Sequence, residues 1–243
     1  MFKKSLAVLA SLIVSGTAVT IPASAEEVSI SGGVDIISTY VFRGFQLADE
    51  AIQPYVEIGK GGFYTGVWFS TPLDSREFFD NEVDIYAGYS FDISESLSGD
   101  VGFTRYIYTD SDGESDTTEL YAGLAIDAPL EPSVYLYYDL DLEATTLEGS
   151  AGHSYPVSET VSLDLGGTLG FIDADGDDFT YFLASAALTK PVADNAEAYV
   201  SVNFGANSED TFIDDSNDLF NNGDLTQLES SGFWFGIGFT ASN

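Results

Sequence analysis

Residues 82–92 read EVDIYAGYSFD and residues 133–143 read SVYLYYDLDLE, and both stretches alternate between apolar and polar positions. In the first, Val83, Ile85 and Phe91 share one face, and Glu82 and Asp84 share the other. Successive side chains of a β-strand point to opposite sides, so the pattern predicts strands with one apolar face. Similar alternation at 119–127, 161–171, 197–204 and 233–240 extends this prediction along the chain.

Twelve strands are expected, at 28–43, 50–58, 62–70, 82–92, 97–108, 118–127, 133–143, 146–155, 160–172, 179–189, 196–205 and 231–241. Every second connection is short, as in GKG, SES and PVSE, whereas several of the others are long and acidic, such as 71–81, 109–117 and 206–224. Short turns on one side and longer loops on the other are typical of outer-membrane barrels. The sequence therefore predicts an all-β fold, a transmembrane antiparallel up-and-down β-barrel of about 12 strands with both termini on the short-turn side.

The first 25 residues have the pattern of a signal peptide. Lys3 and Lys4 precede an apolar run at 6–14, and Ala23-Ser24-Ala25 fits a small-residue cleavage site. We expect a mature barrel domain of residues 26–243, exported to the outer membrane of a Gram-negative bacterium. The chain has no cysteine, which excludes disulfides and thiol chemistry.

The composition is strongly acidic, with 40 Asp and Glu against seven Lys and Arg and a formal net charge of −33. Nucleic acid is excluded as a partner, because its phosphates must be neutralised by Lys and Arg. Acidic disordered chains lack aromatic residues. This one is 14% aromatic and 44% hydrophobic, so it can present a large apolar surface to lipid.

Residues 39–73 contain two distinctive elements, YVFRG at 40–44 and GFYTGVW at 62–68. They resemble the opening of the TorF-type porins, a family of conserved outer-membrane proteins of unknown function. Further similar stretches are EVDIYAGYSF at 82–91, TELYAGL at 118–124 and YLYYDLD at 135–141. The resemblance implies an outer-membrane location and a pore role, and it implies no particular solute.

The polar face of the predicted strands is acidic. In a barrel this face lines the lumen, where rings of carboxylates favour cations. An alternative is that polar residues merely fill the face turned away from lipid. The candidate pore-lining carboxylates are Glu82, Asp84, Asp100, Glu119, Asp139, Asp141 and Asp164.

Two arginines bear on this face. Arg43 is in phase with Asp35, which predicts a lumen position and pairing with lumen carboxylates. Arg105 shares the apolar phase of Val101 and Phe103, so we expect a bulge there or a place near the outer interface, where the side chain reaches the polar layer.

No catalytic residues and no cofactor are expected. Twelve-stranded outer-membrane phospholipases need a histidine that activates a serine nucleophile. The chain has one histidine, His153, and its neighbour Ser154 would point to the opposite face of a strand. His153 is therefore expected at the membrane interface.

Two loop fragments, Asp110-x-Asp112-Gly113 and Asp173-x-Asp175-Gly176-Asp177, carry oxygen ligands in a spacing that suits Ca²⁺. Neither fragment holds a full ligand set. We expect solvated acidic loops, with weak Ca²⁺ binding as the alternative. Gly66, Gly88 and Gly123 lie within predicted strands, where close approach of another group or barrel curvature accounts for them.

Two functions from different classes remain open at this point. One is a diffusion channel for small polar solutes or ions that prefers cations. The other is a closed, side-chain-filled barrel that acts as a structural or surface-interaction protein through its acidic loops. Twelve strands fall between the filled eight-strand barrels and the open sixteen-strand porins, so the strand number does not decide.

Overall fold

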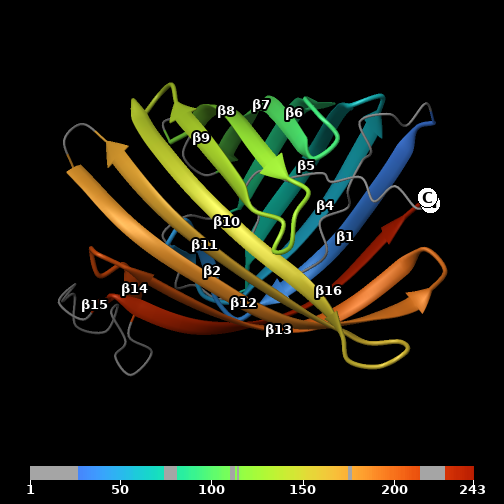
Figure 1. Cartoon of the computed structure of the whole chain (residues 1–243). Coiled ribbons are helices and arrows are strands. Elements are labelled where there is room, and N and C mark those ends of the chain that lie inside the picture. Colours follow the sequence, from blue (N-terminus) through green and yellow to red (C-terminus); the bar gives the residue numbers. More distant parts are fainter. Residues whose placement is uncertain (1–26, 74–80, 110–112, 114, 175–176, 214–227) are drawn as a thin grey trace.

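The computed structural model describes residues 27–73, 81–109, 113, 115–174, 177–213 and 228–243. Twelve antiparallel strands form a closed barrel, as the sequence predicts. Neighbours in the chain are neighbours in the barrel, and the ring closes where β1 pairs with β16 (Figure 1). The wall strands are β1 (Ser29–Ile37), β4 (Ala51–Lys60), β5 (Phe63–Pro72), β6 (Glu82–Asp92), β7 (Leu97–Tyr108), β8 (Thr117–Ile126), β9 (Ser133–Asp139), β10 (Ala144–Pro156), β11 (Ser162–Ala174), β12 (Asp177–Ala193), β13 (Ala196–Asn207) and β16 (Ser231–Ser242).

The alternation along each strand separates an apolar outside from a polar inside. On β16, Phe233 and Phe235 are 69% and 63% exposed, whereas Trp234 between them is 5% exposed. A barrel in lipid shows this arrangement, because its outer face contacts hydrocarbon and its hydrogen bonds are all satisfied between strands. Among the described residues, no helix is long and apolar enough to cross a membrane.

The connections are sorted between the two ends of the barrel as the sequence predicts. At one end the strands are joined by short turns at 61–62, 93–96, 127–132, 157–161 and 194–195. Both ends of the barrel chain lie there, since the Ile30 backbone N–H donates to the side chain of Asn243 over 2.8 Å. The longer connections lie at the other end, and the one between β13 and β16 contributes a small sheet of β14 (Phe212–Ile213) and β15 (Leu228–Glu229).

The first predicted strand, 28–43, is wrong in its second half. The wall strand β1 ends at Ile37, and the chain then forms an inner hairpin of β2 (Tyr40–Phe42) and β3 (Phe45–Ala48). Arg43 and Gly44 form its tip, with φ of 48° and 83°. Such positive values are rare outside glycine and tight hairpin turns. We call residues 38–50 the inner hairpin.

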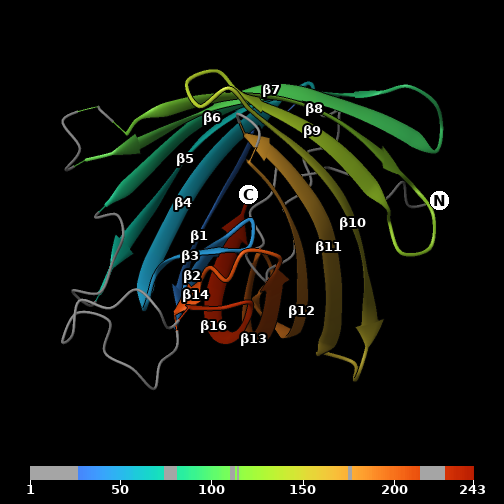
Figure 2. The same cartoon turned by 90° about the vertical axis from the view of Figure 1, so that its left-hand side faces the viewer.

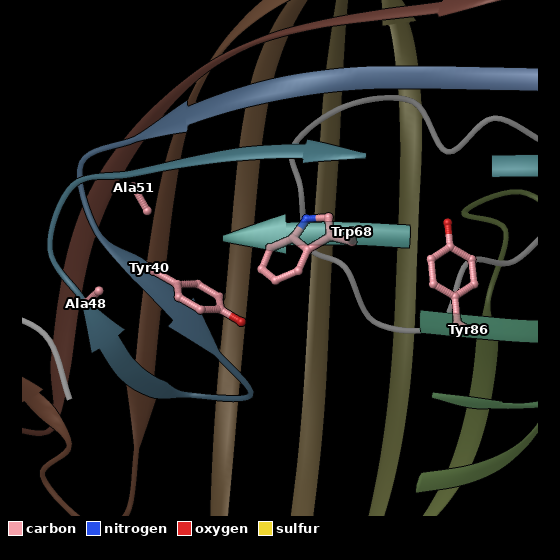
Figure 3. Packing of buried hydrophobic residues seen from close by; sticks show 5 residues of the cluster. All are labelled: Tyr40, Ala48, Ala51, Trp68 and Tyr86. Carbon is pink, nitrogen blue, oxygen red and sulfur yellow. The ribbon is translucent and has the colours of Figure 1, made fainter. Parts of the chain in front are cut away.

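The inner hairpin lies within the ring of wall strands instead of extending beyond it (Figure 2). Its Tyr40 packs on Trp68 of β5, with ring centroids 5.6 Å apart, and both belong to a buried cluster that also holds Ala48, Ala51 and Tyr86 (Figure 3). The barrel therefore contains a folded segment of its own chain.

Two other strands end four residues away from their predicted ends. The strand expected at 133–143 ends at Asp139, because residues 140–143 form a turn in which Glu143 has a positive φ of 53°. The strand expected at 179–189 is longer and runs from Asp177 to Ala193.

Candidate pore lumen

The inner wall carries eight buried carboxylates within the described residues. They extend over β1, β4 and the consecutive strands β6 to β10, and they are Asp35, Glu57, Glu82, Asp84, Asp100, Glu119, Asp139 and Glu148. Arg43 is the only buried cation in the same part of the chain. The described lumen thus has a large formal excess of negative charge.

Tyrosine hydroxyls donate to many of these carboxylates, in most cases from a strand two positions away in the wall. Tyr64 and Tyr135 both donate to Asp100, over 3.0 and 3.2 Å. Tyr181 donates to Glu148 over 2.6 Å. Similar bonds join Tyr40 to Glu82, Tyr106 to Glu119 and Tyr199 to Asp35. A hydroxyl donor satisfies the hydrogen-bonding capacity of a buried carboxylate and brings no opposite charge.

The lumen tyrosines lie against glycines of adjacent strands. A Cβ at Gly88 would collide with the ring of Tyr64, and a Cβ at Gly170 would collide with the ring of Tyr181. Gly66 and Gly123 support Tyr86 and Tyr135 in the same way. Close approach of an aromatic ring therefore explains why these strand positions are glycine.

The charge of the lumen is asymmetric. No buried carboxylate occurs in the described parts of β12, β13 and β16, where the inner face presents small or neutral side chains. Examples are Ala187, Thr189, Ser201 and Asn203. A solute inside the barrel would meet a carboxylate and tyrosine wall on one side and a neutral wall on the other.

The tip of the inner hairpin is fixed to the far walls by its two central residues. Arg43 donates two hydrogen bonds to Glu119 of β8, over 2.5 and 2.9 Å, and its guanidinium lies 4.1 Å from the ring centroid of Tyr137. The carbonyl of Gly44 accepts from the side chains of Asn207 and Thr211. These contacts hold the hairpin across the lumen.

The ion pair between Arg43 and Glu119 is secluded, with side-chain exposures of 7% and 5%. Burial lowers the pKa of Arg43, but the negative charge of Glu119 and other nearby groups raises it by more than burial lowers it. The pKa of Arg43 therefore lies well above its usual value, and the guanidinium stays charged. Arg43 thus neutralises one carboxylate of the acidic wall.

A cavity of about 1010 Å³ lies beside the inner hairpin, at the end of the barrel that carries the longer connections. We call it the outer vestibule. The hairpin contributes Phe42, Arg43 and Phe45 to its lining, and the wall contributes aromatic and acidic side chains, including Tyr106, Tyr108, Glu119, Asp139 and Phe179. A site of this size, largely apolar with a few polar groups, has the dimensions of a small-molecule pocket.

Most of the predicted pore-lining residues do lie on the inner face. Glu82, Asp84, Glu119 and Asp139 are each at most 7% exposed. Asp164 is half-buried on β11, where its Oδ2 accepts from Ser162 and its Oδ1 is enclosed.

Asp141 is the exception, and its predicted lumen position is wrong. It follows the end of β9, is exposed, and lies 3.5 Å from Arg105 Nη1 in an ion pair. Arg105 also pairs with Asp116 over 3.3 Å. There is no bulge at Arg105, which is in regular register with Ile85 and Thr118 near the long-loop end of β7. Its guanidinium is satisfied by loop carboxylates at the rim, and this accounts for an arginine on the apolar phase.

The position of Arg43 was predicted from the phase of a wall strand that ends six residues earlier. Arg43 nevertheless contacts a lumen carboxylate, because the inner hairpin turns into the barrel. Glu57, Glu148 and the lumen tyrosines were not among the residues expected to line the pore. Glu148 lies on the polar face of the regular strand β10. The alternation along such a strand is the signal that could have identified Glu57 and Glu148 as lumen residues.

His153 lies on the outer face of β10, with its ring 4.6 Å from that of Tyr155 in an edge contact. Ser154 is the next residue of the same strand and pairs with Asp164 of β11. The two side chains therefore point to opposite sides of the wall and form no nucleophile pair.

The Ca²⁺-like fragments fall largely outside the described residues, since 110–112 and 175–176 are not among them. Within the described ranges, no group of three or more His, Cys, Asp or Glu side chains is placed to hold a metal ion.

Solved structures that resemble this chain include porins. It superposes on the KdgM porin with a TM-score of 0.53 and 13% identity, covering 88% of this chain and 98% of that one. A structure of the KdgM porin in complex with disordered oligogalacturonate gives a TM-score of 0.54 at 13% identity, with the same coverage. The NanC porin gives 0.53 at 11% identity, covering 88% and 99%. At these identities the likeness establishes the fold.

A comparison with curated proteins finds no match. Residues 21–155 match the model of a family described as "Bacterial protein of unknown function (Gcw_chp)", which is more than half of the chain. The chain belongs to this Gcw_chp family.

Proposed function

We propose that the protein is an outer-membrane diffusion channel for small polar solutes and that it prefers cations. One observation carries the proposal: within the described barrel, eight buried carboxylates lie on the wall and a ninth, Asp49, lies on the inner hairpin, against one buried guanidinium. The apolar outer surface and the resemblance of residues 39–73 to TorF-type porins support the membrane location.

The preference follows from electrostatics in a confined space. Like charges on the wall of a lumen bounded by low-dielectric material focus their field, which raises the local cation concentration and repels anions. The oligogalacturonate in the KdgM complex is an anionic oligomer. The lumen wall of the present chain is negative, as that oligomer is, so we expect a different class of solute.

The inner hairpin narrows the path. Its tip lies between Glu119 on one wall and Tyr181 and Asn207 on another. A solute must pass beside it, along the neutral wall or the acidic wall, so the hairpin sets the size limit of the channel.

Single-channel recording in planar bilayers tests the proposal. The protein is expressed with its natural leader, and N-terminal sequencing of the outer-membrane fraction should give Glu26 as the first residue. Reversal potentials in a KCl gradient should show K⁺ preferred over Cl⁻, more strongly at low salt, because salt screens the wall charges. Anion preference would contradict the electrostatic argument.

The anchored hairpin also favours a second candidate, a closed barrel that acts as a structural or surface-interaction protein through its acidic loops. In that case the hairpin is a permanent plug. Protein that is shown to be folded by its heat-dependent gel shift, and that conducts no current, would support this candidate and exclude the channel.

A further inference from the structure

The outer vestibule combines two chemistries that recognise the same kind of ligand. Aromatic rings line it from both the hairpin and the wall, including Phe42, Phe45, Tyr106 and Phe179. Two pairs of these rings are in edge contact, Phe42 with Tyr106 at 5.8 Å and Phe45 with Phe179 at 4.5 Å. Aromatic faces attract cations and apolar bodies, and they do so more strongly where water is excluded.

Asp139 supplies a carboxylate to the lining of this cavity. The residue is 6% exposed. Its Oδ1 accepts from the backbone N–H groups of Asp141 and Leu142, over 2.9 and 2.8 Å, which fixes the side chain. Neither of these bonds involves Oδ2. Oδ2 is therefore the oxygen left to accept from a donor group that enters the cavity.

The other charges around the vestibule strengthen this assignment. Arg43 also lines the vestibule, but its positive charge is paired with Glu119. It therefore does not repel a cationic ligand. Asp178 and Glu209 add carboxylates to the lining. The vestibule is therefore complementary in charge to a cation and in shape to an apolar group.

We infer that the outer vestibule is a binding site for organic cations that carry an aromatic or branched apolar group, with the cationic nitrogen against Asp139 Oδ2 and the apolar group among the rings. This inference rests on the proposed channel and names the class of solute that it takes up first. The volume of about 1010 Å³ accommodates a molecule of drug-like size or smaller.

The test uses benzyltrimethylammonium as the probe, with benzyl alcohol and benzenesulfonate as neutral and anionic analogues of similar shape. Binding to the full mature chain, refolded in detergent, is measured by calorimetry, and block of the K⁺ current is measured from the long-loop side. The cation should bind and block. The neutral analogue should bind at least about tenfold more weakly, since a charge-assisted contact is worth more than about 1.4 kcal/mol. The anion should not bind.

Asp139→Asn is the decisive variant, because asparagine keeps an oxygen for the two backbone N–H groups and loses only the charge. It should weaken cation binding about tenfold or more. Asp141→Asn is the matched control, since Asp141 is exposed and pairs with Arg105 outside the vestibule. It should bind as the unchanged chain does. The gel shift verifies that both variants fold.

The outcomes separate the inference from the proposed function. A cation-selective current that the probe does not block, or equal binding by the Asp139 and Asp141 variants, would overturn the inference and leave the channel intact. Binding that depends on Asp139 in a barrel that conducts nothing would support the site and overturn the channel.

Discussion

The ion pair between the inner hairpin and β8 offers a sharp test of the lumen architecture. Arg43→Met removes the guanidinium but keeps an unbranched side chain of similar length. Glu119 then retains one described donor, Tyr106, at 3.2 Å. Because the two side chains are only 7% and 5% exposed, solvent screens the lost interaction weakly.

The expected cost follows from that seclusion. Breaking a buried ion pair by removing one partner destabilises a protein by about 3–5 kcal/mol, because the remaining charge is left uncompensated. An exposed pair is worth only about 0–1 kcal/mol. We therefore expect the free energy of unfolding of Arg43→Met to fall by about 3 kcal/mol or more, unless the hairpin leaves the lumen and lets water reach Glu119.

A double-mutant cycle separates these effects. Glu119→Gln removes the other charge with little change of shape, and the double variant contains neither. The double variant should lose less unfolding free energy than the two single variants lose together, because it leaves no charge buried and unpaired. Urea unfolding of the barrel in lipid vesicles measures the free energy, and single-channel conductance reports whether the hairpin has left the lumen.

A loss below about 1 kcal/mol for Arg43→Met, together with unchanged conductance and no coupling to Glu119→Gln, would refute the reasoning. That combination would mean that the pair is solvated and does not hold the hairpin. A small loss with raised conductance would instead show that the hairpin detaches readily once the pair is broken.

Single positions give three further predictions. Asp139→Asn should reduce the preference for K⁺ over Cl⁻ in reversal-potential measurements, whereas Asp141→Asn should leave it within error, and equal effects would contradict their different placement. Gly170→Ala should cost about 1–3 kcal/mol of unfolding free energy, because a methyl group there meets a tyrosine ring, whereas Gly149→Ala is the control, since the nearest atom to its added Cβ is 4.0 Å away. His153→Ala should preserve the heat-dependent gel shift and the conductance, because the ring lies on the outer face, and a hydrolase activity that disappears with this change would show the residue to be functional.

The amino-acid sequence by itself determined the barrel wall. Alternation within 82–92 and 161–171 identified strands and divided their residues between lipid and lumen, and the structure follows that division at Glu82 and Asp84. The sorting of short turns and long loops determined the topology. These features are local, since each depends on the pleat of one strand or the length of one connection.

The inner hairpin was decided by tertiary structure alone. The sequence predicts one strand over 28–43, so its pattern does not distinguish a strand in the wall from one inside the lumen. The difference lies in contacts between distant residues. Arg43 and Glu119 are 76 residues apart, and Gly44 and Asn207 are 163 apart.

The same reason explains Asp141 and the tyrosine network. Asp141 continues the phase of Asp139, but the strand ends first, and the turn that follows places the Asp141 carboxylate beside Arg105 of β7, two strands away. Several tyrosines reach their carboxylates across one intervening strand, over glycines whose role appears only when the strands are side by side. A periodic pattern specifies which side of a strand a residue takes, whereas closure of the ring decides which residues from different strands meet.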